Sequence, residues 1–156
     1  MMERQQDIGA RIAAEAELWI DTPFRWQGRK RGVGCDCKGL IAGVAESCGR
    51  PEAESLEALS GDYSNIVDER RLFAGLSRLF DRVSERQAGD VLLLWIDGKA
   101  QHLAIAAPSS RRPDRVIEAM IGRLARVRPG MAPSHRVVAI FRWRRDTDCA
   151  RARGSD

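Results

Sequence analysis

The sequence predicts a single α+β domain in which helices come first and an antiparallel sheet follows. Up to about residue 83, apolar residues recur every three or four positions, the period of a helix with one buried face. After Gly89 the pattern changes to short apolar runs separated by turn residues, which is typical of strands. Helices followed by strands favour an antiparallel sheet with the helices packed against it. The chain has 156 residues, 44% of them hydrophobic, enough to bury a core of its own.

The first predicted helix covers residues 6–20. Its apolar side chains lie three or four positions apart: Ile8, Ile12, Ala16, and Trp19 or Ile20. The helix ends at Asp21-Thr22-Pro23, and a basic loop containing glycines follows at residues 27–34.

Further helices are predicted before residue 84. The second begins beside Cys37, has an apolar stripe from Leu40 to Cys48, and stops at residues 49–51. A short helix is expected over residues 52–59. Asp68 is expected to cap the last helix. The apolar face of that helix is long: Leu72, Phe73, Leu76, Leu79, Phe80 and Val83.

Short strands are predicted in the second half, at residues 90–96, 102–107, 115–119, 124–128 and 136–143. Turn-forming residues separate them, at residues 97–98, 108–114 and 129–134. The Asp97-Gly98 turn is expected to bring the chain back, so that His102 lies on a strand antiparallel to the first one. We expect residues 1–145 to form the domain and the charged residues 146–156 to form a flexible tail.

Composition and charge exclude several classes of protein. The longest apolar run, residues 91–96, is six residues, against about 20 for a membrane helix. The first residues lack the apolar stretch of a secretory signal, so we expect synthesis in the cytoplasm without a signal peptide. The net charge of +4 is compatible with an acidic partner, but also with a solvated basic surface. The aromatic residues do not interleave with the 23 arginines as in a known nucleic-acid-binding module, so no nucleic-acid partner is expected.

Four cysteines lie at positions 35, 37, 48 and 149. They do not form the two CxxC pairs of a zinc site, so no metal or other cofactor is expected. Cys35 and Cys37 are too close for an unstrained disulfide. Cys48 lies on an apolar stripe and is expected in the core, whereas Cys149 lies in the charged tail.

Cys37 is the candidate nucleophile. In the segment GCDCKGL, residues 34–40, Asp36 occupies the position of a helix N-cap and Cys37 falls in the first turn. A thiol there faces unpaired backbone N–H groups and the positive end of the helix dipole, which stabilise the thiolate. The same amides can donate to an oxyanion, and Gly39 lets another backbone approach closely. The alternative is a small buried side chain, a frequent fate of free cysteine.

A cysteine nucleophile needs a base, and the chain has two histidines. His102 opens a predicted strand, QHLAIAA, and a strand end is a rigid place from which to aim a side chain. His135 follows a proline in a predicted turn and is expected to be exposed. His102 is therefore the candidate base.

Four stretches in this order resemble the NlpC family of papain-fold cell-wall peptidases: TPFRWQG (22–28), GCDCKGL (34–40), AGDVLLL (88–94) and HLAIA (102–106). The resemblance covers roughly residues 6–143 and is greatest to short tail-associated peptidases of prophages and gene transfer agents. It implies a papain-like, NlpC-type fold with N-terminal helices packed on a C-terminal antiparallel sheet.

The resemblance also implies a function. Cys37 would be the nucleophile, His102 the general base, and Glu118 in RVIEAM the third, polar catalytic residue. The substrate would be the peptidoglycan stem peptide, cut between D-glutamate and a diamino acid such as meso-diaminopimelate. Tail-tip or hub proteins would be the partners, and a phage-like tail would deliver the enzyme to the periplasmic cell wall from outside.

Three residues are predicted to bind substrate: Phe24, Trp26 and Asp36. A packing role is the alternative for Trp26. Phe24 stands where the family commonly has tyrosine, so a hydroxyl near the cysteine is missing. Glu118 stands where histidine, asparagine or glutamine is usual; a carboxylate can orient an imidazole, or it can be a surface residue of an edge strand. These two departures support a second hypothesis, a structural tail-tip component that keeps the fold without the activity.

Overall fold

The computed structural model describes residues 4–60, 69–122 and 125–145. The expected cap Asp68, the expected strand residue Leu124, Cys149 and the tail at 146–156 lie outside these ranges. The described helices are α1 (Gln5–Leu18), α2 (Cys37–Ser47), α3 (Ala53–Ser60) and α4 (Glu69–Leu79). None of them has the length and apolarity needed to cross a membrane.

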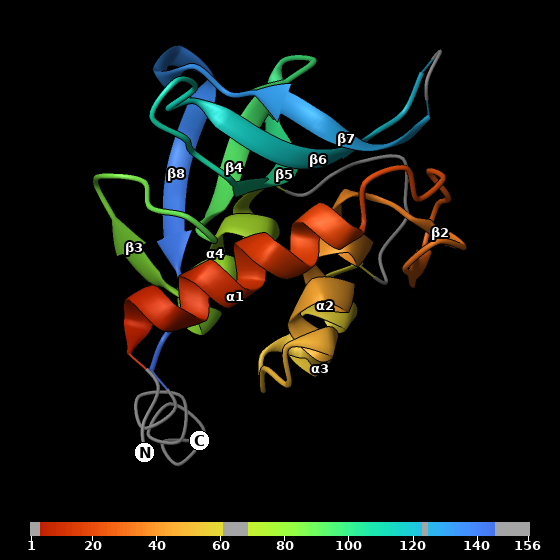
Figure 1. Cartoon of the computed structure of the whole chain (residues 1–156), viewed down its shortest axis with the longest axis horizontal. Coiled ribbons are helices and arrows are strands. Elements are labelled where there is room, and N and C mark those ends of the chain that lie inside the picture. The colour runs from red at the N-terminus through yellow and green to blue at the C-terminus, as the bar shows by residue number, and fades with distance from the viewer. Residues whose placement is uncertain (1–3, 61–68, 123–124, 146–156) are drawn as a thin grey trace.

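A six-stranded, fully antiparallel sheet follows the helices, in the order β3-β8-β4-β5-β6-β7. Its strands are β3 (Asp81–Val83), β4 (Val91–Ile96), β5 (Lys99–Ala106), β6 (Arg115–Met120), β7 (Arg126–Met131) and β8 (Val137–Arg142). Two short strands, β1 (Arg29–Lys30) and β2 (Gly34–Cys35), pair between α1 and α2. Most of the sheet lies in the upper part of Figure 1, and α1, α2 and α3 lie below it. The predicted α+β class, with N-terminal helices and a C-terminal antiparallel sheet, is confirmed.

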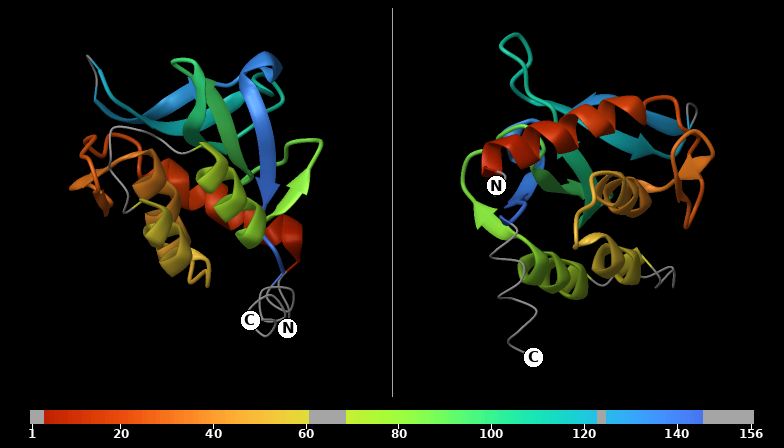
Figure 2. Two further views of the ribbon diagram at one scale, coloured as in Figure 1. Left: turned by 180° about the vertical axis from the view of Figure 1, so that it is seen from behind. Right: turned by 60° about the horizontal axis from the view of Figure 1, so that its bottom comes forward.

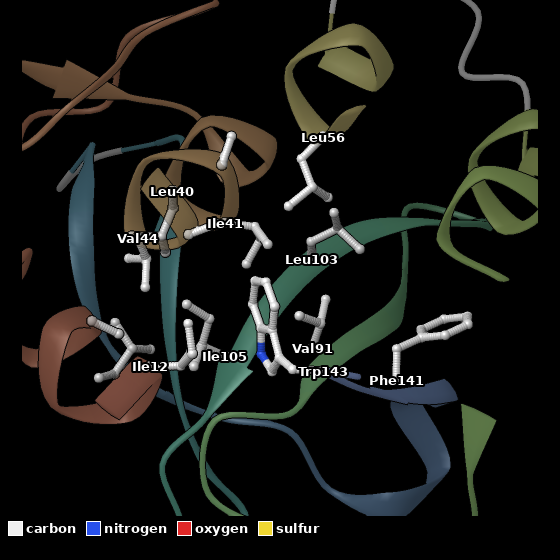
Figure 3. Packing of buried hydrophobic residues seen from close by; sticks show 14 of the residues in the cluster. Ile12, Leu40, Ile41, Val44, Leu56, Val91, Leu103, Ile105, Phe141 and Trp143 are labelled. Atoms are coloured by element: carbon white, nitrogen blue, oxygen red, sulfur yellow. The ribbon is translucent and has the colours of Figure 1, made fainter. Parts of the chain in front are cut away.

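The main core lies between the helices and one face of the sheet (Figure 2, Figure 3). Leu40, Ile41 and Val44 of α2 are buried there with Leu103 and Ile105 of β5. Burying each such side chain stabilises the fold by roughly 1.5–3 kcal/mol. The alternate residues of the strands form a second, smaller cluster: Leu92, Leu94, Ala104, Ala106 and Val116, joined by Ala132. Because both faces of the central strands are buried, β5 and β6 are held rigidly.

The Gly89-Asp90 segment before β4 has a structural role. A Cβ on Gly89 would lie 2.1 Å from the carbonyl oxygen of Gly9, so α1 can pack this closely only against glycine. Gly89 also has a φ of +87°, a conformation that favours glycine. The Asp90 carboxylate accepts two hydrogen bonds from Arg142, at 3.0 and 2.9 Å. The motif therefore attaches β4 to α1 and β8.

The sheet splits between β5 and β6. The two strands pair only at Ile105 with Ile117 and at Ala106 with Val116, so the first half of β5 and the second half of β6 diverge. Helix α2 contacts both strands. This split exposes the strand edge from which His102 and Leu103 can reach the start of α2.

The predicted boundaries were wrong at the last helix and at β7. The last helix ends at Leu79, and Val83 belongs to β3, because the chain there pairs with β8. Residues 129–131, predicted as a turn, extend β7. Pro129 is tolerated because β7 is the last strand of the sheet, where a missing N–H breaks no ladder bond.

The first hairpin is tighter than predicted. Asp97 and Gly98 both have positive φ, +50° and +79°, and Ile96 pairs with Lys99, as in a two-residue hairpin turn. Strand β5 therefore begins three residues earlier than predicted, and His102 lies inside the strand instead of opening it.

Candidate active site

Asp36 fixes the start of the helix that carries Cys37. Its Oδ1 accepts a hydrogen bond from the amide of Gly39 at 2.7 Å, which confirms it as the N-cap of α2. Its Oδ2 accepts another from the amide of Gln27 at 3.0 Å. The carboxylate is buried, so its observed role is to hold the helix start against the loop of residues 22–28. The predicted substrate contact of Asp36 stays a prediction.

Two glycines bring that loop onto the helix. A Cβ on Gly39 would lie 1.8 Å from the carbonyl oxygen of Gly28, so no larger residue fits without movement of the backbone. The same carbonyl accepts a hydrogen bond from the amide of Asp36 at 3.2 Å. The close approach predicted for Gly39 is therefore present.

Cys37, the first residue of α2, is partly exposed and lies at the split between β5 and β6. The His102 side chain and the Leu103 amide both interact with its thiol and lower its pKa. Sequence patterns could not identify Leu103 as part of the site, because its backbone amide makes the contact and its side chain belongs to the core.

His102 and Glu118 lie together beneath the thiol. His102 on β5 is 6% exposed and Glu118 on β6 is 4% exposed. The His102 Nε2 and Glu118 Oε2 atoms are 3.5 Å apart, and neither has a closer hydrogen-bonding partner among the described residues. His102 also interacts with Cys37. The imidazole therefore interacts with both the thiol and the carboxylate. Glu118 lies on β6, which is an inner strand of the sheet and not the expected edge strand.

This arrangement favours a thiolate and an imidazolium. Burial alone would raise the pKa of Cys37, but the hydrogen bond and charge of His102 and the Leu103 amide outweigh it, so that pKa lies below its usual value. Burial alone would lower the pKa of His102, but its contacts with Cys37 and Glu118 raise that pKa to about 9. At neutral pH the site can therefore hold a nucleophilic sulfur beside a proton donor.

The other cysteines differ from Cys37 in their surroundings. Cys35 is fully buried, and this burial, with the negative charge of Asp36, raises its pKa to about 12. Cys48, expected in the core, is only partly buried at its edge. Its thiol lies 3.8 Å from the carbonyl oxygen of Arg11.

The loop of residues 22–28 runs along the edge of β7 and then reaches the helix start. The amide of Phe24 donates to the carbonyl of Ala125 at 2.7 Å. The Phe24 ring packs partly against the core and meets the Trp26 ring edge-on, with centroids 5.0 Å apart. Trp26 is 65% exposed, so its packing is limited to one side of the ring, where it meets Phe24. Substrate contact by either ring stays a prediction.

His135 is exposed on a short 3-10 helix, Ser134–Arg136, as expected. The His102 ring, by contrast, is buried against Cys37 and Glu118. Within the described ranges no group of three or more histidine, cysteine, aspartate or glutamate side chains is placed to hold a metal ion.

We expect iodoacetamide at neutral pH to modify Cys37 well before Cys35 and Cys48. Alkylation requires the thiolate, and the pKa of Cys37 is lowered by a neighbouring hydrogen-bond donor and positive charge, whereas burial raises the pKa of Cys35. Peptide mass spectrometry over a time course measures the three rates, with Cys35 as the buried control and Cys48 as the partly exposed one. Modification of Cys48 ahead of Cys37 would contradict an activated thiolate.

Several solved structures share this fold. The NlpC/p60 domain of the peptidoglycan hydrolase SagA matches with a TM-score of 0.53 and 26% identity, over 85% of this chain and 97% of that chain. NlpC2 from Trichomonas vaginalis matches with a TM-score of 0.59 and 15% identity, over 87% of this chain and 47% of that one. A Staphylococcus aureus protein described as similar to lipoprotein, NLP/P60 family, matches with a TM-score of 0.57 and 18% identity, over 90% of this chain and 43% of that one.

No family model matches the sequence, and no curated protein does. The structural neighbours include NlpC/p60 domains, and the match to the SagA domain covers nearly the whole of that domain. The chain thus has the α+β fold of the NlpC/p60 domains, a fold that includes a domain of a peptidoglycan hydrolase.

Proposed function

We propose that this protein is a peptidoglycan hydrolase, a cysteine endopeptidase that cuts the stem peptide with Cys37, His102 and Glu118. The observation that carries the proposal is the cluster of three side chains at the start of α2. In this cluster His102 interacts with both Cys37 and Glu118. A thiol at a helix N-terminus with a charged imidazole beside it is the arrangement that nucleophilic catalysis by cysteine requires.

The first half of the reaction would form an acyl-enzyme. The Cys37 thiolate attacks the carbonyl carbon of the scissile amide, and the carbonyl oxygen becomes an oxyanion. The first hydrogen bond of α2 runs from the Leu40 amide to the Asp36 carbonyl. The amides of Cys37 and Lys38 come before it and have no partner within the helix, so this N-terminal end of α2 can stabilise the negative charge of the oxyanion. The His102 imidazolium then gives its proton to the leaving amine, and the C–N bond breaks.

The second half would release the product. Neutral His102 takes a proton from water, and the resulting hydroxide attacks the thioester carbonyl. The carbon–sulfur bond breaks, the acid product leaves, and the thiolate and imidazolium are restored. Throughout, the Glu118 carboxylate would orient the ring and stabilise its positive charge.

The bond between D-glutamate and a diamino acid is the proposed point of cleavage. Its support is the resemblance of the GCDCKGL and HLAIA segments to the NlpC family. Trp26 is exposed and lies on the loop that Asp36 holds beside the helix start. Its ring provides an apolar surface that substrate can contact.

Delivery by a phage-like tail is the proposed route to the wall. The resemblance of the four sequence motifs to tail-associated peptidases of prophages and gene transfer agents supports it. Tail-tip or hub proteins are then the expected partners. The same resemblance leaves a structural tail-tip component as the second candidate, and the absence of a hydroxyl at Phe24 favours it.

Digestion of purified sacculi tests the enzymatic proposal. The protein is expected to release fragments with a new amino terminus on the diamino acid, identified by mass spectrometry of the soluble products. Sacculi rich in meso-diaminopimelate and sacculi with lysine stem peptides would show the preference for the diamino acid. A folded protein whose Cys37 is alkylated normally but which releases nothing from either wall would favour the structural component.

A further inference from the structure

Gly130 lies beside the Glu118 side chain. Strands β6 and β7 pair Glu118 with Arg128 and Val116 with Gly130, so Gly130 shares a sheet face with Glu118 and is its diagonal neighbour. A Cβ placed on Gly130 would lie 2.8 Å from Oε1 of Glu118, 2.9 Å from its Cδ and 3.3 Å from its Cγ. The Glu118 side chain therefore occupies the space that any larger residue at position 130 would need.

The backbone at position 130 does not itself demand glycine. Gly130 is not among the residues with positive φ, so its conformation is open to an alanine. Glycine inside a strand costs stability, because it loses more conformational freedom on folding and has no side chain to pack. A glycine that the backbone does not require, directly against a buried carboxylate, indicates a packing reason.

We propose that Gly130 is a positioning residue of the catalytic site: the space left by its missing side chain holds the Glu118 carboxylate at His102. The inference rests on the proposed role of Glu118 as the partner of His102. The three atoms nearest to the added Cβ all belong to the flexible Glu118 side chain, and two of them are in its carboxyl group. An added methyl group would therefore displace the carboxylate from the imidazole without unfolding the strand.

Other charged or titratable groups lie on the neighbouring elements: Cys37 of α2 and its N-cap Asp36, Glu69 of α4, whose Oε1 accepts from the Ala100 amide, and Arg128 of β7, which pairs with Glu118. The three atoms nearest to a Cβ at Gly130 all belong to Glu118 and to none of these groups. A change in the titration of His102 in Gly130→Ala therefore reports on Glu118.

The test is the titration of the histidine rings by NMR in the free protein, without substrate. A carboxylate at this distance shifts the pKa of a neighbouring group by about one unit or more. Glu118→Gln should lower the pKa of His102 by about that amount, and Gly130→Ala should lower it by about half as much or more. The double variant should match Glu118→Gln alone, because no carboxylate is left to displace. His135 gives an internal reference, and Met131→Ala, an exposed neighbour on β7, should leave both titrations unchanged.

Three results would overturn the inference. One is a His102 titration in Gly130→Ala identical to that of the parent protein. Another is a double variant in which the two shifts simply add. The third concerns stability: if Gly130→Ala lowers the Tm, adding Glu118→Ala should restore it by clearing the space, and a Tm that stays low contradicts the packing argument.

The inference and the proposed function fail separately. If the titrations behave as expected but the protein releases nothing from sacculi, Gly130 still positions Glu118, and the proposed peptidase function is rejected. If the titrations are unchanged but the enzyme is active, the positioning role of Gly130 is rejected, and the peptidase function stands.

Discussion

Replacing Cys37 with alanine is expected to reduce peptidoglycan hydrolysis by at least about 10⁴-fold while the domain stays folded. The substitution removes the sulfur that attacks the amide, and no neighbouring group can take its place, because Cys35 is buried with a pKa of about 12. Alanine is a good helix former, and Cys37 lies at the partly exposed start of α2, ahead of the buried run that begins at Gly39. The rate of muropeptide release measures the activity, and circular dichroism measures the fold.

Cys35→Ala is the matched control for this variant. The residue lies two positions away and is fully buried, so its loss should leave a small cavity and lower the stability, while most of the activity remains. Equal loss of activity in both variants, at equal folded fractions, would mean that the nucleophile is misassigned or that the two sulfurs act as a pair.

His102→Ala is expected to lower kcat/KM by several orders of magnitude. Removing a positioned acid–base group costs about 10²- to 10⁴-fold in rate, and here the group also ionises the nucleophile. Without His102, burial remains while the hydrogen bond and the positive charge are lost, so the pKa of Cys37 should rise. The pH dependence of iodoacetamide alkylation measures this rise independently of substrate.

His135→Ala provides the comparison, since His135 is exposed on the short helix before β8. It should keep the parental kcat/KM and the parental alkylation profile. Loss of activity in this variant, with His102→Ala active, would show that the base has been assigned to the wrong histidine.

Several features of the site could be predicted because they depend on neighbours in the chain. The apolar period of residues 40–48 predicts α2, and Asp36 at its start is the N-cap. Asp97-Gly98 predicts the hairpin that makes the β5 strand antiparallel to β4. Each of these depends on contacts within a few residues, such as the bond from the Gly39 amide to Asp36, so the local sequence carries the information.

Features that depend on distant pairing could not be predicted in this way. The end of α4 at Leu79 follows from pairing of Asp81–Val83 with β8, about sixty residues later. The strand conformation of Pro129 follows from the position of β7 at the end of the sheet. Local propensity had favoured a helix and a turn at these places, and tertiary pairing overrode both.

The sequence by itself determined the α+β class and the helix start at Cys37, and it predicted His102 over His135 as the candidate base. The tertiary structure decided how these parts meet. The split between β5 and β6 lets His102 contact Cys37, and the pairing of β6 with β7 puts Gly130 against Glu118. The physical reason is that a helix cap or a tight turn is stabilised within one turn of chain, whereas the register and divergence of strands depend on the packing of residues far apart in the sequence.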